Sequence, residues 1–453
     1  MATAGSQGAP RQARALALAR NPKLWLFPSI LSALVAVLLS LLYLGGIVNP
    51  TGHLHRLPIA LVNADQGPPP PGRSVDLGTE LTRAVLAGTP GDTVDWRRTD
   101  EAGARDLLAS GKVYGALLVP ADFTATVGRL TAGGATERPT LTVLTNPGLG
   151  SLGSSLAAQI AQNAAHQASV AAGKELLAAV PAAGGSTGSG AAAGGSAGSG
   201  AGAGARGPDT GATARLLLAD PFAVTTRVGH PIGTHSGLGL SAFYYTLLAV
   251  LTGFIGGNII HNGVDGALGY SDSEIGPWHT RRPTVPISRT QTLLLKMVMT
   301  AGIMLLTTSL VLLCTAGILG MDAPHQALLW LFAYCASLAV GLGVQAINAA
   351  FGGIGQLVSM FVFIALALPS SGATVPLQAV PGFYRFLGVF EPMRQLSDGI
   401  RAILFFDARA DAGLARGWIM IAVGVVLALA FGFGMTRYYD RKGLHRWTPQ
   451  PSD

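Results

Sequence analysis

The sequence predicts a polytopic α-helical membrane protein of about six spans, with a small α/β extracytoplasmic domain inserted between the first and second spans. One apolar stretch, 24–48, stands alone near the N-terminus, and the next begins only at about 238. A spanning helix needs about 20 apolar residues, and 24–48 exceeds this length. Of the 453 residues, 49% are hydrophobic and 12% are charged, which places the chain outside the soluble globular class.

Five further apolar stretches form a predicted five-helix membrane domain over 238–436: 238–260, 293–320, 326–350, 354–370 and 417–436. The stretch 354–370 is short and is flanked by glycine. The first stretch could instead be the apolar core of a signal peptide. Its run is too long for that, however, and no small-x-small cleavage site precedes Asn49-Pro50. We therefore expect an uncleaved membrane anchor.

Basic residues gather in three segments: Arg11, Arg14, Arg20 and Lys23; Arg281, Arg282, Arg289 and Lys296; and Arg437, Arg441, Lys442 and Arg446. Six spans place these segments on one side, and an excess of positive charge marks the cytoplasmic side. Together they carry twelve basic and five acidic residues, whereas 49–237 has thirteen of each sign. Both termini are therefore expected in the cytoplasm, with 1–23 as an interfacial segment and 437–453 as a tail.

The charge pattern also bears on partners and location. Topology and contact with anionic membrane lipid explain the net charge of +7 fully, so nucleic acid is not an expected partner. Arginine far outnumbers lysine, and alanine and glycine are abundant, which is typical of a GC-rich bacterial genome. We expect a multi-pass protein of the bacterial plasma membrane.

The inserted domain, 49–181, alternates between two patterns. Strands are expected at 59–65, 93–100, 113–120 and 139–147, and helices at 77–88, 101–111 and 121–130. Strands alternating with helices of about ten residues predict a small α/β domain with a largely parallel sheet. An alanine-rich run over about 152–180 predicts a long helix that leaves the globular part.

The segment after this helix has a different composition. Residues 182–206 are almost entirely glycine, alanine and serine. Such a sequence cannot bury enough apolar area to offset the entropy of ordering, so a flexible linker is expected. Residues 207–237 are then expected to return the chain to the membrane.

Motifs for chemistry are missing from the sequence. It has no G-x-x-x-x-G-K-[ST] phosphate loop, and no H-E-x-x-H, C-x-x-C or G-x-S-x-G motif. Cys314 and Cys335 both fall in predicted spans and offer no disulfide framework or metal cluster. Asn63 and Asp65, before Gly67, would suit a cation or polar ligand, but an Asx-type turn is the favoured interpretation. We expect no enzyme activity, no cofactor and no metal.

Acidic residues within spans are expected of proton-driven pumps, where they relay protons. No Asp or Glu lies centrally in any predicted span, and Asp265 lies at the edge of one. The sequence therefore disfavours a proton-driven transporter. Energy for any solute movement is expected to come from elsewhere.

The outer segment 370–416 is too polar to span a membrane, yet it is amphipathic. Apolar residues recur at helical spacing: Phe390, Met393, Leu396, Ile400, Ile403 and Leu404. The opposite face holds Glu391, Arg394, Gln395, Asp398 and Arg401. This pattern predicts a helix on or dipping into the outer leaflet, with Phe390, Met393, Leu396 and Ile400 as candidate lipid-facing residues. A plain surface helix is the alternative.

Three stretches resemble the outer domain of the phage infection protein (YhgE/Pip) family: PIALVNADQG (58–67), VDWRRTDEAGARDLLASGKVYGALLVPADFTATVGRL (94–130) and PTLTVLTNPG (139–148). The N-terminal ARNPKLWLFPSILSALV (19–35) is similar to the basic segment and first span of the same family. That family is related to the type-2 permeases of ABC exporters. The run LPSSGATVPLQAVPGFYRFLGVFEPMRQLSDGIRAILFF (368–406) resembles the pattern before the last span in those permeases.

The resemblance implies six spans per subunit, an outer domain after the first span, and a homodimer or heterodimer of permease subunits. It also implies a separate ATPase subunit at the cytoplasmic face. The cytoplasmic loop 261–292 is then the candidate contact surface for that ATPase, through Asp272, Glu274, Arg281 and Arg282. A solvated loop is the competing interpretation. Many family members carry a much longer outer coiled segment, and its replacement here by the alanine-rich helix and linker puts phage reception in doubt.

Two functional hypotheses follow from the sequence. The leading one is the permease subunit of an ATP-driven exporter that moves a hydrophobic or amphipathic substrate out of the cell. The other is a non-transporting membrane scaffold or surface receptor, associated with phage or secretion, that acts through its outer domain. Lipids, lipophilic drugs and wall precursors suit the first hypothesis equally.

Overall fold

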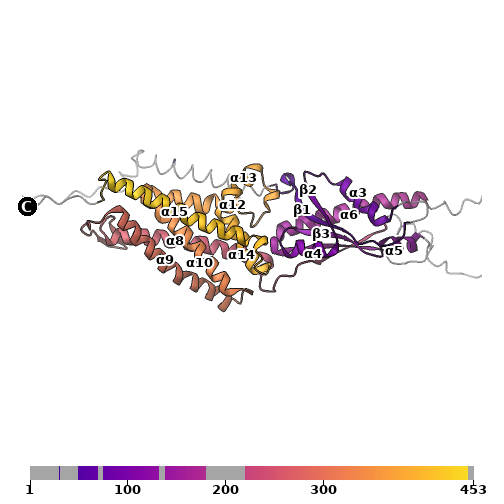
Figure 1. Cartoon of the computed structure of the whole chain (residues 1–453), viewed down its shortest axis with the longest axis horizontal. Coiled ribbons are helices and arrows are strands. Elements are labelled where there is room, and N and C mark those ends of the chain that lie inside the picture. The colour runs from indigo at the N-terminus through magenta and orange to yellow at the C-terminus, as the bar shows by residue number, and fades with distance from the viewer. Residues whose placement is uncertain (1–29, 31–48, 70–74, 132–137, 180–219, 447–453) are drawn as a thin grey trace, which may run out of the picture.

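The computed structural model describes residues 30, 49–69, 75–131, 138–179 and 220–446. These residues form a sheet domain at one end of an elongated molecule and a helical bundle at the other (Figure 1). The predicted segments 1–23 and 182–206 lie outside the described residues. So does the predicted first span 24–48, except for Ile30.

The sheet domain contains five strands: β1 (Leu57–Asn63), β2 (Val94–Thr99), β3 (Gly115–Val119), β4 (Thr140–Thr145) and β5 (Ala223–Val228). Their order in the sheet is β2-β1-β3-β4-β5. The pairs β1–β2, β1–β3 and β4–β5 are parallel, but β3 and β4 are antiparallel. The sheet is therefore largely parallel, as predicted, with one antiparallel pair at its centre, where two parallel groups run in opposite directions.

The reversal has a visible cause. Four helices belong to this domain: α3 (Leu77–Gly88), α4 (Glu101–Ala109), α5 (Phe123–Thr131) and α6 (Ser151–Ala179). Figure 1 shows α5 at the end of the sheet farthest from the bundle. Because α5 does not return the chain along a face of the sheet, β4 begins where β3 ends and runs back toward the bundle.

Side chains of β1 show how the two faces are covered. Leu57, Ile59 and Leu61 alternate with Ala60 and Val62, as the two faces of a strand require, and all five are almost fully buried. The first three side chains pack in the clusters that include α6, and the other two pack in the cluster that includes α4. The sheet is therefore sandwiched between helices, as an α/β domain requires.

The turn after β1 confirms the structural interpretation of Asp65. Its carboxylate accepts hydrogen bonds from the backbone N–H of Gly67 (3.1 Å), Gly78 (3.0 Å) and Thr124 (3.1 Å). The side-chain oxygen of Asn63 accepts from the backbone N–H of Asp65 at 3.2 Å. The carboxylate therefore organises the backbone of the turn.

The helical bundle contains α8 (Ser241–Ala267), α9 (Arg289–Leu312), α10 (Gln326–Phe351), α11 (Gly355–Met360), α12 (Ala367–Ser370), α13 (Gly382–Phe390), α14 (Pro392–Phe405) and α15 (Leu414–Arg441). Within the described residues, four helical stretches are long and apolar enough to cross a membrane: Ser241–Ala267, Arg289–Ile318, Gln326–Ser370 and Leu414–Arg441. The chain is therefore a membrane protein. We call the end of the bundle nearest the sheet domain its proximal end, and the opposite end, where α8 ends and α9 begins, its distal end.

The stretch Gln326–Ser370 reverses direction at its middle. Gly352 has φ 62°, a conformation that a helix does not tolerate, and it ends α10. After this break, Gln356 donates a hydrogen bond to Asn262 (2.7 Å) at the distal end of α8, whereas Ala367 packs with Phe243 at its proximal end. The predicted stretches 326–350 and 354–370 are thus two antiparallel limbs.

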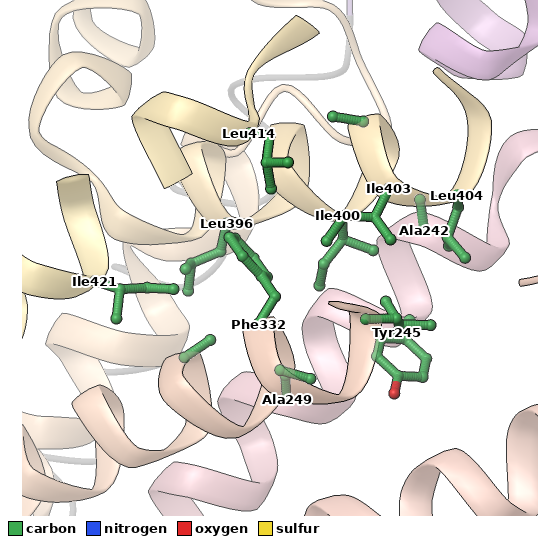
Figure 2. Packing of buried hydrophobic residues seen from close by; sticks show 14 of the residues in the cluster. Ala242, Tyr245, Ala249, Phe332, Leu396, Ile400, Ile403, Leu404, Leu414 and Ile421 are labelled. Carbon is green, nitrogen blue, oxygen red and sulfur yellow. The ribbon is translucent and has the colours of Figure 1, made fainter. Parts of the chain in front are cut away.

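The core of the bundle lies where α14 meets the long helices. Figure 2 shows Leu396 and Ile400 of α14 directed toward Phe332 of α10 and Tyr245 of α8. A Cβ placed on Gly253 of α8 would collide with the backbone of α10, so these two helices need a glycine at their crossing. Close packing is accompanied here by a buried hydrogen bond, which the hydroxyl of Ser337 on α10 donates to the carbonyl of Ala249 on α8 at 2.9 Å.

Several contacts fix the sheet domain to the proximal end. Leu57 and Tyr114 share a buried cluster with Val380 and Tyr384, and the backbone N–H of His55 donates to the carbonyl of Gln378 at 2.7 Å. The chain crosses the junction a second time after β5. The sequence did not predict the strand β5. The segment 207–237 therefore does more than return to the membrane, because its residues 223–228 complete the sheet.

Candidate functional site

The distal end of the bundle carries a small exposed β-hairpin. Its strands are β6 (Ser273–Ile275) and β7 (Trp278–Thr280), and Gly276 at the turn has φ 59°, which favours glycine. The hairpin lies between α8 and α9, within the predicted loop 261–292. The side chain of Trp278 is 72% exposed, so a large aromatic surface is available at the tip.

The structure brings the four residues proposed for partner contact to this hairpin. Asp272 lies 3.7 Å from the Nε of Arg281 and 3.5 Å from the Nε2 of His279. Asp272, Glu274 and Arg282 border a hollow of about 640 Å³ beside the distal end of α8. Arg281 is more exposed than Asp272, with 82% of its side chain accessible. The loop therefore presents both signs of charge on one exposed surface.

A buried charge cluster lies behind the hairpin. The Nζ of Lys296, on α9, lies 2.7 Å from the Oδ1 of Asp265, on α8. The two residues are only 3% and 4% exposed. Burying a charge is costly unless it is paired, so this pair binds the distal ends of the two helices to each other.

The chain beyond α15 completes the cluster. The Nη1 and Nη2 atoms of Arg446 each lie 2.9 Å from one oxygen of Asp265, which is the strong bidentate geometry of a guanidinium and a carboxylate. The guanidinium also lies over the ring of Tyr270, 4.5 Å from its centroid. One carboxylate therefore ties together α8, α9 and the C-terminal segment.

His261, one turn before Asp265, completes the hydrogen bonding. Its Nδ1 lies 2.9 Å from the Nζ of Lys296, and its Nε2 lies 3.3 Å from the Oδ2 of Asp265. An ammonium group can only donate, so Nδ1 accepts and the proton of a neutral imidazole is on Nε2, facing the carboxylate. The cluster thus has a continuous set of donors and acceptors.

These residues form one wall of a polar cavity of about 340 Å³. Three basic residues, Arg289, Lys296 and Arg446, line the cavity together with one carboxylate, Asp265, which is paired with the last two. Asn262 and Ser271 line both this cavity and the hollow beneath the hairpin, so the two spaces adjoin. Tyr270, which precedes the hairpin, lies under the guanidinium of Arg446, so the loop and the buried cluster are in contact.

Sequence reasoning did not find this cluster. It counted Lys296 and Arg446 only as cytoplasmic positive charge and placed Asp265 at the edge of a span. A usable signal existed, because His261 and Asp265 lie four residues apart on one face of an otherwise apolar helix. The partner on α9 could be recognised only from the packing of the two helices.

The predicted lipid-facing helix needs correction. Phe390 ends α13 and is 65% exposed, but Met393, Leu396 and Ile400 lie on α14 and are almost fully buried. The apolar stripe packs against the protein core and not against the outer leaflet, because α14 lies within the bundle at its proximal end (Figure 1), where Leu396 and Ile400 are directed toward Phe332 and Tyr245 (Figure 2). The exposed apolar face belongs to α13 instead, through Phe383, Phe386, Val389 and Phe390.

The fold and the distal cluster define the class as a membrane-embedded helical bundle that carries a separate α/β sheet domain. The sequence of residues 28–424 matches a protein family described as "Protein of unknown function (DUF3533)". The chain belongs to this family, since the match covers most of its length. Comparison with curated proteins gave no match, and comparison with solved structures gave none either.

Proposed function

We propose that the protein is the permease subunit of an ATP-driven exporter, related to the type-2 permeases of ABC transporters and energised by a separate ATPase. In this proposal the stretch 24–48 is the first of six spans, and the sheet domain is extracytoplasmic. Both termini and the distal hairpin lie in the cytoplasm of a bacterial cell, and two permease subunits form the transporter. The charge pattern along the sequence supports this orientation.

One observation carries the proposal: the exposed hairpin joins the ends of α8 and α9 in the chain, and Tyr270, just before it, lies against the guanidinium of Arg446. Asp272 and Arg281 present charge for a partner, while Asp265 links α8, α9 and the C-terminal segment immediately behind them. A partner that moves the hairpin would act directly on two long helices. This is the connection that an ATPase needs in order to drive a permease that has no nucleotide-binding motif of its own.

The bundle also offers a surface for a hydrophobic substrate. A groove of about 280 Å³ lies between α10, the helix around Phe363 and α15, and its lining is almost wholly apolar. Gly343 and Gly424 line it, and small residues leave room for an acyl chain or a lipophilic ring. We propose a hydrophobic or amphipathic substrate on this basis.

The experiment is purification of the full chain from its own membrane in mild detergent, followed by reconstitution with the proteins that accompany it. We expect a nucleotide-binding subunit to co-purify and to support ATP-dependent transport of a lipophilic fluorescent dye. The double variant Asp272→Arg/Glu274→Arg should lose the subunit. Glu101→Arg, on the exposed start of α4 in the sheet domain, is the matched control and should retain it. Absence of both the subunit and the transport would refute the proposal.

A scaffold or receptor that acts through the sheet domain is distinguished by a substitution in the groove. Val362→Gln places a polar group among apolar side chains and should impair a transporter. A scaffold should tolerate it as long as the protein reaches the membrane. A variant that keeps full cellular function while losing dye transport would support the scaffold.

A proton-driven transporter is a second candidate, and the Asp265–Lys296 pair favours it. Ionisable residues within spanning helices often mark proton pathways, and this pair was not apparent from the sequence. Transport assays in reconstituted vesicles distinguish the two energy sources. Transport that stops with a protonophore but continues without ATP would support proton coupling, and the reverse result would support the ATPase.

A further inference from the structure

A second polar cavity lies at the junction between the sheet domain and the bundle, about as far from the distal cluster as the bundle allows. Its volume is about 280 Å³. The loop around Gly111 and Lys112 of the sheet domain forms one side, and α14 and the start of α15 form the other. Ser371 and Gly372 close it. Neither domain alone would make this cavity.

Its lining is strongly basic. Its five basic residues are Arg97, Lys112, Arg394, Arg401 and Arg416. Its two acidic residues are Asp398 and Asp411. Asp411 is already engaged, because the Nζ of Lys112 and the Nε of Arg409 lie 2.6 Å and 3.2 Å from its carboxylate. The remaining carboxylate, Asp398, faces three arginines.

The three arginines are not balanced by Asp398. Burial raises the pKa of this carboxyl, and the charges of Arg401, Arg394 and Arg416 oppose that rise without overcoming it. The closest of them, Arg401, is 3.7 Å away. Three guanidinium groups face one carboxyl, so a net positive charge remains in the cavity even when Asp398 is ionised.

Arg401 is the buried member of the three arginines. Its residue is 4% exposed, and its Nη2 donates to the backbone carbonyl of Ala373 at 2.7 Å. Its buried Nε has no hydrogen-bond partner among the described residues. Its Nη1 lies 3.5 Å from the carbonyl of Gly372, so the guanidinium is held in place beside the cavity, and Arg394 and Arg416 are the more accessible donors for an anion.

We propose that this junction cavity binds a phosphoryl anion, held by Arg394, Arg401 and Arg416. Guanidinium groups suit phosphate because their N–H donors form a fork that matches its oxygens. The volume admits a phosphoryl headgroup but not a whole lipid. The source is either free phosphate or the headgroup of an anionic lipid. The site does not depend on whether the protein transports a substrate.

The exposed face of α13 is consistent with a lipid source. Phe383, Phe386 and Phe390 are each at least 60% exposed, and phenylalanine is typical of the apolar face of helices that lie at a membrane interface. This face is connected to the cavity through Arg394, whose Nη1 donates to the carbonyl of Gly388 on α13 at 3.2 Å. A lipid whose chains lie beside α13 could place its phosphate among the arginines.

The test is isothermal titration calorimetry of the full chain in an uncharged detergent. Three probes are compared: inorganic phosphate, dihexanoylphosphatidylglycerol, and dihexanoylglycerol, which lacks the phosphate. Binding of either phosphate-bearing probe but not of dihexanoylglycerol supports the site. Binding of the phospholipid alone identifies a lipid headgroup, and binding of inorganic phosphate identifies the free anion. Failure of both phosphate-bearing probes, or equal binding of dihexanoylglycerol, overturns the proposal.

Variants locate the site. Arg416→Gln should weaken binding about tenfold, since a charge-assisted hydrogen bond is lost. Arg416 is exposed, so its substitution should leave packing intact. Arg98→Gln is the matched control, because Arg98 neighbours Arg97 on β2, points to the opposite face and does not line the cavity. Asp398→Asn removes the opposing carboxylate and should strengthen binding. Equal losses of affinity in Arg416→Gln and Arg98→Gln, or a loss of affinity in Asp398→Asn, would show that the anion binds elsewhere.

Discussion

The Nζ of Lys112, in the sheet domain, lies 2.6 Å from the Oδ2 of Asp411, just before α15. A second ion pair joins Arg409 to Asp106 at 2.8 Å. Residues about 300 positions apart in the sequence thus hold the sheet domain against the bundle. These pairs are exposed, so they set the orientation of the domain more than its stability.

The pH dependence of this junction follows from Asp411. Hydrogen bonds from Lys112 and Arg409 lower its pKa to about 2 from the usual 3.8. Because the folded pKa is depressed, its contribution is present above about pH 4 and is lost as the pH falls toward 2. We expect the thermal midpoint of the wild type to fall more steeply than that of Asp411→Asn over this window. Parallel curves for the two proteins would contradict the assignment, and 1 M salt should reduce the difference.

Glu391 should give the opposite pH dependence. Burial raises the pKa of this carboxyl, at the start of α14, to about 8. A raised folded pKa means that stability is greatest below about pH 4.5 and declines as the pH rises through 8, where the buried group must ionise. Glu391→Gln can still accept the hydrogen bond from the backbone N–H of Met393 (2.7 Å) but cannot ionise. Between pH 5 and 9 the thermal midpoint of this variant should decline less than that of the wild type. An equal slope of midpoint against pH in the two proteins would refute the prediction.

Asp265 and Lys296 should differ in their effect on stability although they form one pair. Asp265→Asn leaves both Lys296 and Arg446 without a counter-charge and should cost about 3 kcal/mol, the lower range for breaking a buried pair. Lys296→Met should cost less, because Asp265 keeps its bidentate contact with Arg446. Equilibrium unfolding in detergent measures the loss of stability in both variants. Asp272→Asn, on the exposed hairpin, is the control, and its loss of stability should be near zero. Equal losses in the two variants would show that Arg446 does not compensate.

The crossing of α8 and α10 can be tested at a single glycine. A methyl group at Gly253 would meet the carbonyl of Ser337 and the side chain of Val340, so Gly253→Ala should cost about 1–3 kcal/mol of stability. Gly302→Ala on α9 is the matched control, because nothing lies within 4 Å of its added Cβ. Alanine favours helix over glycine by about 1 kcal/mol, so this control should be neutral or stabilising. A similar loss in both variants would mean that helix propensity, not packing, governs the result.

Local signals explain most of what the sequence could predict. The helices at 77–88 and 101–111 begin at Asp76 and Asp100, whose carboxylates accept from the backbone N–H of Thr79 (2.7 Å) and Gly103 (2.9 Å). These caps are visible in the sequence, so the start of α3 and of α4 was predicted correctly. Four of the five strands were also found, because alternating or continuous apolar runs mark them.

What the sequence could not show depends on contacts between distant residues. β5 is an edge strand with exposed residues at its end, and only its pairing with β4 reveals it. The periodicity of α14 identified the buried face correctly but could not show whether lipid or protein covers it, since both are apolar. Asp265 and Lys296 each resembled an ordinary charge near a span end, and their pairing required the packing of α8 against α9.

The late position of β5 has a consequence for movement. The chain enters the sheet at Leu57, the start of β1, and leaves it at Val228, the end of β5. Both strand ends lie at the end of the sheet that faces the bundle. After the exit, His230 makes a 2.7 Å hydrogen bond with the carbonyl of Phe405 at the end of α14. The sheet domain is therefore joined to the bundle by the connection after Val228 and by the buried cluster that Leu57 shares with Val380 and Tyr384. A tilt of the proximal end of the bundle would therefore move the sheet domain with it, and the far end near α5 would show the largest displacement.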